Sequence, residues 1–285
     1  MNISSIIVFD AKSVHEVLNL LDKEPGKWAL LAGGTDLMVQ MDLGTLKPQN
    51  FINIWGLPDL SGITGRKDEV EIKALTTFSD IINHPIIKKE FPMLIEAAHL
   101  TGSIAIQNRG TVGGNIMNAS PAADTPPALL AYAAEIELAS KNEVRRLFYK
   151  DFHINYKVMR INPDEILTKI ILPRTSEKTM DFYQKVGTRA AHSISKACVA
   201  IRLKLDKKII KDIKIGLGSV APMPMRVYMT EELLRGNKLS MDLIDEAVLQ
   251  IAREIHPIDD IRSNKAYRLR VAINLIKNFL KGHIS

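Results

Sequence analysis

Two glycine-bearing stretches carry the residues that could do chemistry in this chain. Residues 30–41 read LLAGGTDLMVQM, and residues 108–124 read NRGTVGGNIMNASPAAD. The glycines of the second stretch offer backbone N–H groups that no Cβ atom obstructs, and the hydroxyl of Thr111 and the amide of Asn115 stand beside them. Groups of this kind can bind the oxygens of a diphosphate. The two stretches together predict one ligand held between two loops.

The phosphate chemistry expected here is that of a cofactor. A P-loop has a lysine directly after its last glycine, whereas Thr35 and Asn115 occupy those positions. Phosphate charge would then be met mainly by backbone amides, which suits a diphosphate inside a cofactor better than a transferable γ-phosphoryl group. Either glycine pair alone is more typical of an ordinary turn, so it is the two pairs in this order that favour a binding site.

The residues around the first glycine pair predict a strand, a turn and a helix. Residues 28–31 are apolar and predict a buried strand that runs into the turn at Gly33. Thr35 and Asp36 are expected to cap a helix over residues 37–41. The strand and the helix would hold the glycine turn at the edge of the ligand site.

The remaining pattern predicts an α+β chain in two parts. The elements expected in the first part are a strand at residues 6–9, a helix from a capping box at Ser13, a strand at 51–54, hairpins at 60–74 and 136–148, helical residues 77–101 broken at Pro85, a helix after Pro126 and a strand at 165–172. Residues 174–178 are polar and aperiodic, which is typical of a domain boundary. The elements expected beyond them are a three-stranded antiparallel sheet at residues 182–186, 197–205 and 209–217, and two helices capped by Ser240 and Ser263.

Length and composition are those of an ordinary globular chain. The 285 residues, 46% apolar and 25% charged, leave room for two domains, and no apolar run approaches the roughly 20 residues that a membrane span needs. The N-terminus lacks the pattern of a secretion signal, which favours the cytoplasm. Cys198 is the only cysteine, so an internal disulfide is excluded and any iron–sulfur cluster is expected on a partner chain. The net charge is +6, but lysines and arginines alternate with acids at residues 66–69 and 207–212, which disfavours nucleic acid.

Three further motifs do not predict a site. Residues 216–221, GLGSVA, fit a dinucleotide fingerprint, but Pro222 and Pro224 forbid the helix that this fingerprint must open. Ser193 and Lys196 have the SxxK spacing without the motifs that accompany it in serine acyl-enzymes. The seven histidines show no HExxH spacing and no cysteine companions, so no metal site is predicted.

LLAGGTDL followed later by QNRGTVGGNIMNASPAAD resembles the FAD-binding subunits of the molybdenum hydroxylases, the xanthine dehydrogenase and carbon monoxide dehydrogenase family. The segments DEILTKIILP, KVGTR and GSVAPMPMR carry the same resemblance through the rest of the chain. It implies a two-lobed, PCMH-type α+β FAD-binding domain over residues 1–174, with lobes at roughly 1–56 and 57–174. A C-terminal domain over residues 179–285 would consist of a three-stranded antiparallel sheet plus helices.

The resemblance also implies which residues bind FAD, without a covalent bond. The implied cofactor-binding residues are Ala29, Leu30, Leu31, Ala32, Gly33, Gly34, Thr35, Asp36, Thr101, Thr111, Val112, Gly113, Gly114, Asn115, Asp124, Leu167 and Lys185. Asp124 would accept hydrogen bonds from the cofactor, or it could instead cap the helix that begins at Thr125. Lys185, placed near the ring, would stabilise negative charge on the reduced flavin. His192 could approach the ring or lie in an exposed loop.

The function implied by the resemblance is electron transfer. The redox chemistry would belong to the flavin, so no residue of this chain is expected to be catalytic. Electrons would arrive from a substrate oxidised at a molybdenum cofactor, through iron–sulfur clusters, both held by partner subunits, and would pass to NAD or another acceptor. Residues 191–194 lack the acidic or aromatic residue frequent in this family, which leaves the acceptor open. Two alternatives are a self-contained reductase of the UDP-N-acetylenolpyruvoylglucosamine reductase type and a non-catalytic nucleotide-binding module.

Overall fold

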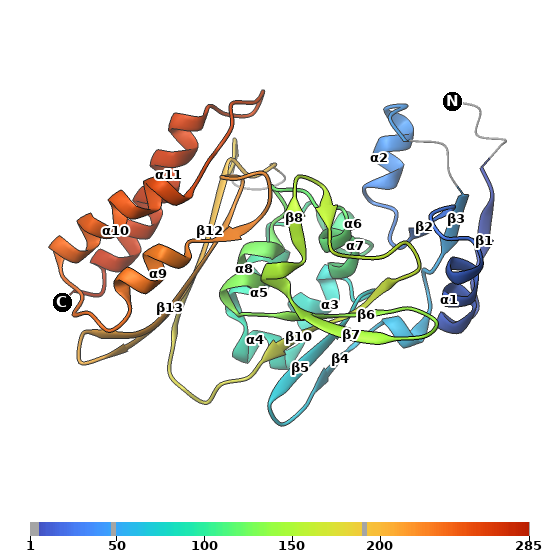
Figure 1. Cartoon of the computed structure of the whole chain (residues 1–285), viewed down its shortest axis with the longest axis horizontal. Coiled ribbons are helices and arrows are strands. Elements are labelled where there is room, and N and C mark those ends of the chain that lie inside the picture. Colours follow the sequence, from blue (N-terminus) through green and yellow to red (C-terminus); the bar gives the residue numbers. More distant parts are fainter. Residues whose placement is uncertain (1–5, 47–49, 190–192, 285) are drawn as a thin grey trace.

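The computed structural model describes residues 6–46, 50–189 and 193–284, and its three main sheets follow one another along the molecule (Figure 1). The N-terminal sheet stands at one end and the C-terminal sheet with its helices stands at the other. A five-stranded sheet with the shorter helices lies between them. Helix and strand are mixed throughout, which confirms the α+β class.

The N-terminal lobe is a parallel three-stranded sheet with two helices. Its elements are β1 (Val8–Asp10), α1 (Val14–Lys23), β2 (Trp28–Leu31), α2 (Leu37–Asp42) and β3 (Asn50–Asn53), and the strand order is β1-β3-β2. Ser13 Oγ accepts a hydrogen bond from Glu16 N at 3.2 Å, but the Glu16 carboxylate bonds Lys12 N, so only half of the predicted capping box forms. Strand β2 is where we predicted it, but its side chains are half-buried.

The second lobe is an antiparallel five-stranded sheet covered on one face by helices. Its strands, in the order β4-β5-β10-β6-β7, are β4 (Ile63–Gly65), β5 (Glu69–Lys73), β10 (Ile166–Pro173), β6 (Glu135–Ala139) and β7 (Val144–Phe148). Its helices are α3 (Phe78–Asn83), α4 (Pro85–Glu90), α5 (Pro92–His99), α6 (Ile104–Gln107), α7 (Val112–Met117), α8 (Thr125–Ala131) and the 3₁₀ turns η2 (Pro58–Leu60) and η3 (Tyr149–Asp151). Both predicted hairpins form. The helical run breaks at Pro85 as predicted and again at Pro92, where the first-turn proline starts α5.

The C-terminal part is an antiparallel sheet packed between helices. Its elements are β11 (Met180–Val186), β12 (Ala197–Asp206), β13 (Ile209–Gly218), β14 (Met225–Arg226), α9 (Tyr228–Leu234), α10 (Met241–Glu254) and α11 (Lys265–Lys281). The three predicted strands are present, and the two-residue β14 adds a fourth. Figure 1 shows α10 and α11 on one side of β12 and β13, and α8 of the second lobe on the other side.

Two details of this C-terminal part follow from local chemistry. Ser240 caps α10 as predicted. Helix α11 is capped by Asn264, whose Oδ1 accepts from Tyr267 N at 2.8 Å, and not by Ser263.

The GLGSVA segment begins at the end of strand β13. A Cβ atom on Gly216 would lie 2.1 Å from the carbonyl oxygen of Pro127. Its glycine therefore allows α8 to pack against β13, and no dinucleotide fingerprint forms.

No helix within residues 6–46, 50–189 and 193–284 is long and apolar enough to cross a membrane. The same residues contain no group of three or more histidine, cysteine, aspartate or glutamate side chains that could hold a metal ion.

Candidate ligand-binding cleft

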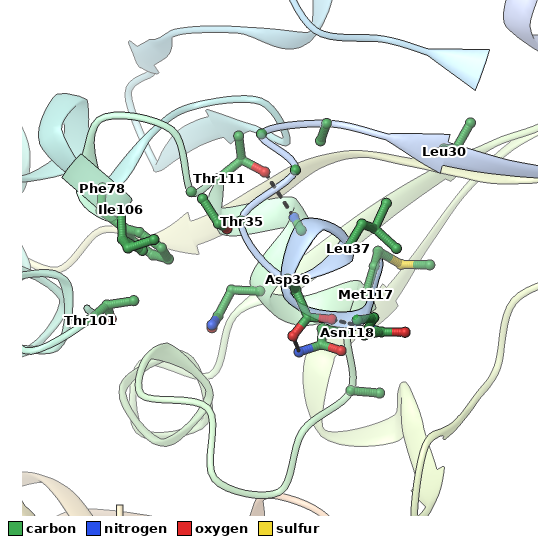
Figure 2. A pocket seen from close by; sticks show the side chains of 18 of the residues that line it. Leu30, Thr35, Asp36, Leu37, Phe78, Thr101, Ile106, Thr111, Met117 and Asn118 are labelled. Carbon is green, nitrogen blue, oxygen red and sulfur yellow. Dashed lines mark hydrogen bonds between the residues drawn. The ribbon is translucent and has the colours of Figure 1, made fainter. Parts of the chain in front are cut away.

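Two adjoining cavities separate the glycine stretches from the C-terminal domain. The smaller, of about 460 Å³, lies between the loop after β2 and helix α7. The larger, of about 1220 Å³, extends from there to the C-terminal domain. Asp36, Asn115, Asn118 and Lys157 line both, so the two form one cleft. Figure 2 shows the smaller cavity, with Asp36 and Asn118 facing Phe78, Thr101 and Ile106 across it.

The first glycine loop presents unused backbone donors to this cleft. Gly33, Gly34, Thr35 and Asp36 line the smaller cavity, and within the described part of the chain no protein acceptor takes a hydrogen bond from their N–H groups. Gly34 has φ +76°, a conformation that favours glycine. Four consecutive amides without protein partners are suited to the oxygens of a phosphate ester.

The two stretches touch at one point of their backbones. A Cβ atom on Gly33 would lie 1.7 Å from the carbonyl oxygen of Arg109, directly before the second stretch's Gly110. Any side chain here would push the first loop away from the second. The two stretches therefore lie against each other, and Gly33 sets how closely they approach.

The second stretch contains helix α7, and this corrects the expectation that its backbone amides are free to bind phosphate. Thr111 caps α7, and its Oγ1 accepts from Gly114 N at 3.0 Å. Val112 N donates to Thr76 O at 3.0 Å, and Gly113 N donates to Ala74 O at 2.9 Å. The amides expected to bind phosphate are thus already bonded within the protein.

The glycines of α7 serve packing. A Cβ atom on Gly113 would lie 2.6 Å from Ala74 O and 2.7 Å from Ala74 Cβ, so glycine lets α7 lie directly against the residue that follows β5. The stretch contributes surface to the cleft through the other members of its TVGGN sequence. Thr111, Gly114 and Asn115 line the smaller cavity, together with Gly110, which precedes this sequence.

Asp36 links the two stretches through its side chain. Its Oδ1 accepts from Asn118 Nδ2 at 3.1 Å, and its Oδ2 accepts from the side-chain amide of Gln40 (Figure 2). It stands at the N-terminus of α2, as predicted, but its side chain makes no capping hydrogen bond. The carboxylate therefore holds α2 against the end of α7 and does not cap a helix.

A buried ion pair closes the far side of the cleft. Lys185 Nζ lies 2.8 Å from Asp124 Oδ2 and donates to Leu100 O at 3.0 Å. Burial raises the pKa of Asp124 to about 6, and the nearby ammonium of Lys185 opposes that rise. Tyr183 donates its hydroxyl proton to the backbone carbonyl of Asp124 at 2.8 Å, which fixes the chain at this residue.

One carboxylate oxygen of Asp124 remains without a partner. Oδ1 is buried and accepts no hydrogen bond from the described residues, because the nearby hydroxyl of Thr101 donates to Ala97 O at 2.8 Å. Asp124 occupies the position before α8, but its side chain makes no capping bond there. A buried acceptor without a donor is a place where a bound ligand can supply one.

The predicted site residues divide into two groups. Those that line the cleft are Leu30, Ala32, Gly33, Gly34, Thr35, Asp36, Thr101, Thr111, Gly114, Asn115, Asp124 and Lys185. Those that line neither cavity are Ala29, Leu31, Val112, Gly113 and Leu167. Leu31 faces a separate apolar cavity of about 170 Å³ on the other side of β2, and Val112 and Leu167 are buried in the core of the second lobe. The role predicted for His192 falls outside the described residues.

Several cleft residues carried no recognisable signal in the sequence. Phe78 and Ile106 belong to apolar helical patterns, which do not distinguish a cavity wall from a core. Gln40 and Asn118 are identified only by their contacts with Asp36. Lys157 lies at a hairpin turn far along the chain, and only the fold brings it to the glycines.

The arrangement fits a large nucleotide cofactor. The amides of the first loop can hold a diphosphate, the apolar side chains of Leu30, Phe78, Ile106 and Met117 supply surface for rings, and Asp124 supplies an unused acceptor. The two-lobed fold and this cleft define a cofactor-binding protein of the mixed α+β type.

Comparison with known proteins identifies the family. Residues 2–175 match the family described as the FAD binding domain in molybdopterin dehydrogenase, and residues 182–282 match the carbon monoxide dehydrogenase flavoprotein C-terminal domain. The chain is similar to the glyceraldehyde dehydrogenase medium chain of Sulfolobus acidocaldarius, with 33% identity over 92% of each chain. It is also similar to the carbon monoxide dehydrogenase medium chain of Hydrogenophaga pseudoflava, with 28% identity over 95% of this chain and 94% of the relative.

A solved structure agrees with the sequence comparison. Carbon monoxide dehydrogenase from Hydrogenophaga pseudoflava contains a chain that superposes with a TM-score of 0.92 and 28% identity, covering 96% of this chain and 95% of that one. The protein therefore belongs to the FAD-binding subunits of the molybdenum hydroxylase family. The predicted family, oxidoreductase class and FAD cofactor are confirmed.

Proposed function

We propose that this chain binds one FAD in the cleft and carries electrons through it as the flavin subunit of a multi-subunit molybdenum hydroxylase. The observation that carries the proposal is the run of four unpaired amides from Gly33 to Asp36, held against the second lobe at Arg109. This run lines the smaller cavity, at the point where the two glycine stretches approach each other. These amides would bind the diphosphate oxygens.

The remaining cleft residues would orient the two ends of the cofactor. Phe78 and Ile106 would pack against it, and the buried Asp124 Oδ1 would accept a hydrogen bond from it. Lys185 lines the larger cavity and is held by Asp124 and the carbonyl of Leu100, so its position is fixed before a ligand binds. Bound FAD would supply the redox chemistry, and the chain's own residues would position it and exclude water.

The partners would be an iron–sulfur subunit and a molybdopterin subunit, with NAD or another molecule as the final acceptor. This part of the proposal is supported by the single cysteine and by relatives described as medium chains of dehydrogenases. A cytoplasmic location is proposed from the N-terminal sequence. The self-contained reductase has less support, because residues 182–282 match the C-terminal domain of a carbon monoxide dehydrogenase flavoprotein.

Reconstitution with FAD tests the binding step. The purified chain, titrated with FAD, should take up one equivalent and show the visible absorption of a bound flavin. Coexpression with its genomic neighbours should yield a yellow complex that contains molybdenum and iron. A chain that binds ADP but shows no flavin absorption would support the nucleotide-binding module, and a yellow chain that never co-elutes with molybdenum would support the self-contained reductase.

Substitution of Lys185 tests the orientation of the cofactor. Lys185→Met removes a positive charge from the wall of the larger cavity and should lower the midpoint potential of the bound FAD while leaving FAD bound. Lys204→Met on β12 is the matched control, because Lys204 pairs with Glu177 and lines neither cavity. An unchanged potential in Lys185→Met would place the flavin ring elsewhere.

A further inference from the structure

A small hairpin places one lysine over the cleft. Strands β8 (His153–Asn155) and β9 (Val158–Met159) pair antiparallel, and residues 156–157 form the turn between them. Lys157 lines both cavities from this turn. The smaller cavity, which contains the unpaired amides, is thus reached by a cation from a different part of the chain.

Lys157 adopts a backbone conformation that does not suit lysine. Its φ is +53°, in the left-handed region that a turn of this kind normally fills with glycine. A residue with a Cβ atom costs roughly 1 kcal/mol more than glycine in this region. Lys207 and Lys208 share this conformation in the turn between β12 and β13, so it is the cavity beside Lys157 that distinguishes it and gives a reason to look for a function of its side chain.

Strand β8 of the hairpin is held in place by the buried side chain of His153. His153 is buried, and its Nε2–H donates to Ile116 O in α7 at 3.2 Å. Burial lowers the pKa of His153, so the neutral ring that makes this bond persists at neutral pH. The ring also packs at 5.2 Å from the ring of Phe152. The turn is therefore tied to α7, the helix within the second glycine stretch.

Lys157 is the cation that reaches the smaller cavity, where the unpaired amides lie. Among the described residues that line the smaller cavity, Asp36 and Lys157 alone are charged. In the larger cavity, Lys185 pairs with Asp124, and Arg262 and Arg268 both pair with Asp260. Lys157 is exposed and forms no ion pair with any described carboxylate.

A diphosphate brought to the first loop would meet the negative charge of Asp36. The amides of Gly33 to Asp36 provide partial positive charge, but they provide no full charge to offset Asp36 and the phosphates together. A lysine ammonium is the usual side chain for this purpose, since it acts as a point charge on phosphate.

We propose that Lys157 is the counter-charge of the FAD diphosphate, delivered by the β8–β9 turn to the edge of the first glycine loop. This inference rests on the proposed FAD site. In a P-loop, the lysine after the last glycine binds the phosphates. Neither glycine stretch of this chain has a lysine at that position, and Lys157, in a turn of the second lobe, would take that role.

Three substitutions separate charge from backbone strain. Lys157→Met removes the charge, Lys157→Arg keeps it, and Lys157→Gly removes the charge while relieving the positive φ. Lys67→Met, in the exposed turn between β4 and β5, is the matched control. The dissociation constants of FAD and of riboflavin, which lacks the diphosphate, are measured for each variant at two salt concentrations.

We expect FAD to bind about tenfold more weakly to Lys157→Met and Lys157→Gly at low salt, with a smaller difference at high salt. Riboflavin affinity should be unchanged, Lys157→Arg should stay within about threefold of the natural chain, and Lys157→Gly should unfold at a higher temperature. Equal FAD affinity in all variants, or equal losses for FAD and riboflavin, would overturn the role of Lys157. Failure of the natural chain to bind FAD would instead overturn the proposed function.

Discussion

The first and second glycine stretches each contain a Gly-Gly pair and use their backbones in opposite ways. In the first, the N–H groups from Gly33 to Asp36 have no protein acceptor in the described part of the chain. In the second, the N–H groups of Val112 and Gly113 are bonded to residues outside the stretch, and that of Gly114 is bonded to the Thr111 hydroxyl within it. The first stretch therefore leaves its amides available to a ligand, as proposed, and the second uses its amides within the protein.

Gly33 and Gly113 have different structural roles in the two stretches. Gly33 and Gly113 both lie against backbone atoms, but Gly33 lies against the other lobe and Gly113 lies against the strand end of its own lobe. A side chain at Gly113 should therefore disturb folding, and a side chain at Gly33 should disturb the distance between the stretches. The two glycines can be separated by experiment.

Gly113→Ala should cause the largest change, in stability. The new Cβ atom would overlap Ala74 O and Ala74 Cβ and would break the hydrogen bond from the residue 113 amide. The free energy of unfolding in urea should fall by about 3 to 4 kcal/mol. Gly282→Ala is the control, because its Cβ atom would lie at an ordinary 3.4 Å from Phe279 O. Equal stability of the two variants would show that α7 can move away from β5.

The aspartates of the two stretches also differ, since Asp36 is exposed and Asp124 is buried. Burial raises the pKa of Asp124 from 3.8 to about 6. The native state then holds this proton more tightly than the unfolded state, so the stability it contributes is full below pH 3.8 and is lost as the pH rises through 6.

This shift corresponds to about 3 kcal/mol between the two pH limits. The stability difference between the natural chain and Asp124→Asn should therefore fall by up to about 3 kcal/mol from pH 4 to pH 7 in the absence of FAD. Urea unfolding of both proteins at each pH measures it. A difference independent of pH would mean that the Lys185 ammonium cancels the effect of burial.

Gly33→Ala should change binding more than stability. Its Cβ atom would overlap Arg109 O, so the first loop must move. The four N–H groups from residue 33 to residue 36 would then no longer be placed to bind the same diphosphate. FAD should bind about a hundredfold more weakly, while the free energy of unfolding changes by less than about 1 kcal/mol. Calorimetric titration with FAD and urea unfolding measure the two effects. A large loss of stability with normal FAD affinity would reverse the roles assigned to the two stretches.

Much of the fold could be predicted because it depends on local pattern. The strand before Gly33, both hairpins and the three long C-terminal strands follow from alternation and turn residues. The errors are also local. Ser263 and Asn264 are adjacent residues with equal capping ability, and the sequence does not decide between them.

The site could be predicted only in part because its contacts are not local. Nothing in the sequence NRGTVGGN reveals that the amides of Val112 and Gly113 bond to Thr76 and Ala74, more than thirty residues earlier. Lys157 belongs to the cleft because a hairpin turn and the buried His153 place it there. Tertiary packing decides which acceptor a backbone amide bonds to, and this cannot be predicted from the residue type.

The smallest expected effect concerns the contact between the lobes. The guanidinium carbon of Arg109 lies 4.0 Å from the ring centre of Trp55, the second residue after β3, and the carbonyl of the same arginine meets Gly33. An exposed cation–π pair contributes about 0.5 to 1 kcal/mol. Arg109→Met should therefore weaken FAD binding by about threefold, because the first loop is held less firmly against the second.

A spectroscopic measurement distinguishes this effect from general loosening. The chain has two tryptophans, so Trp28→Phe leaves Trp55 as the only one. In that background Arg109→Met should shift the emission of Trp55 and weaken FAD binding together, whereas Arg253→Met, on the exposed face of α10, should change neither. A shifted emission with unchanged FAD affinity would show that the Arg109–Trp55 contact does not position the first loop. Gly33 alone would then set the distance between the two stretches.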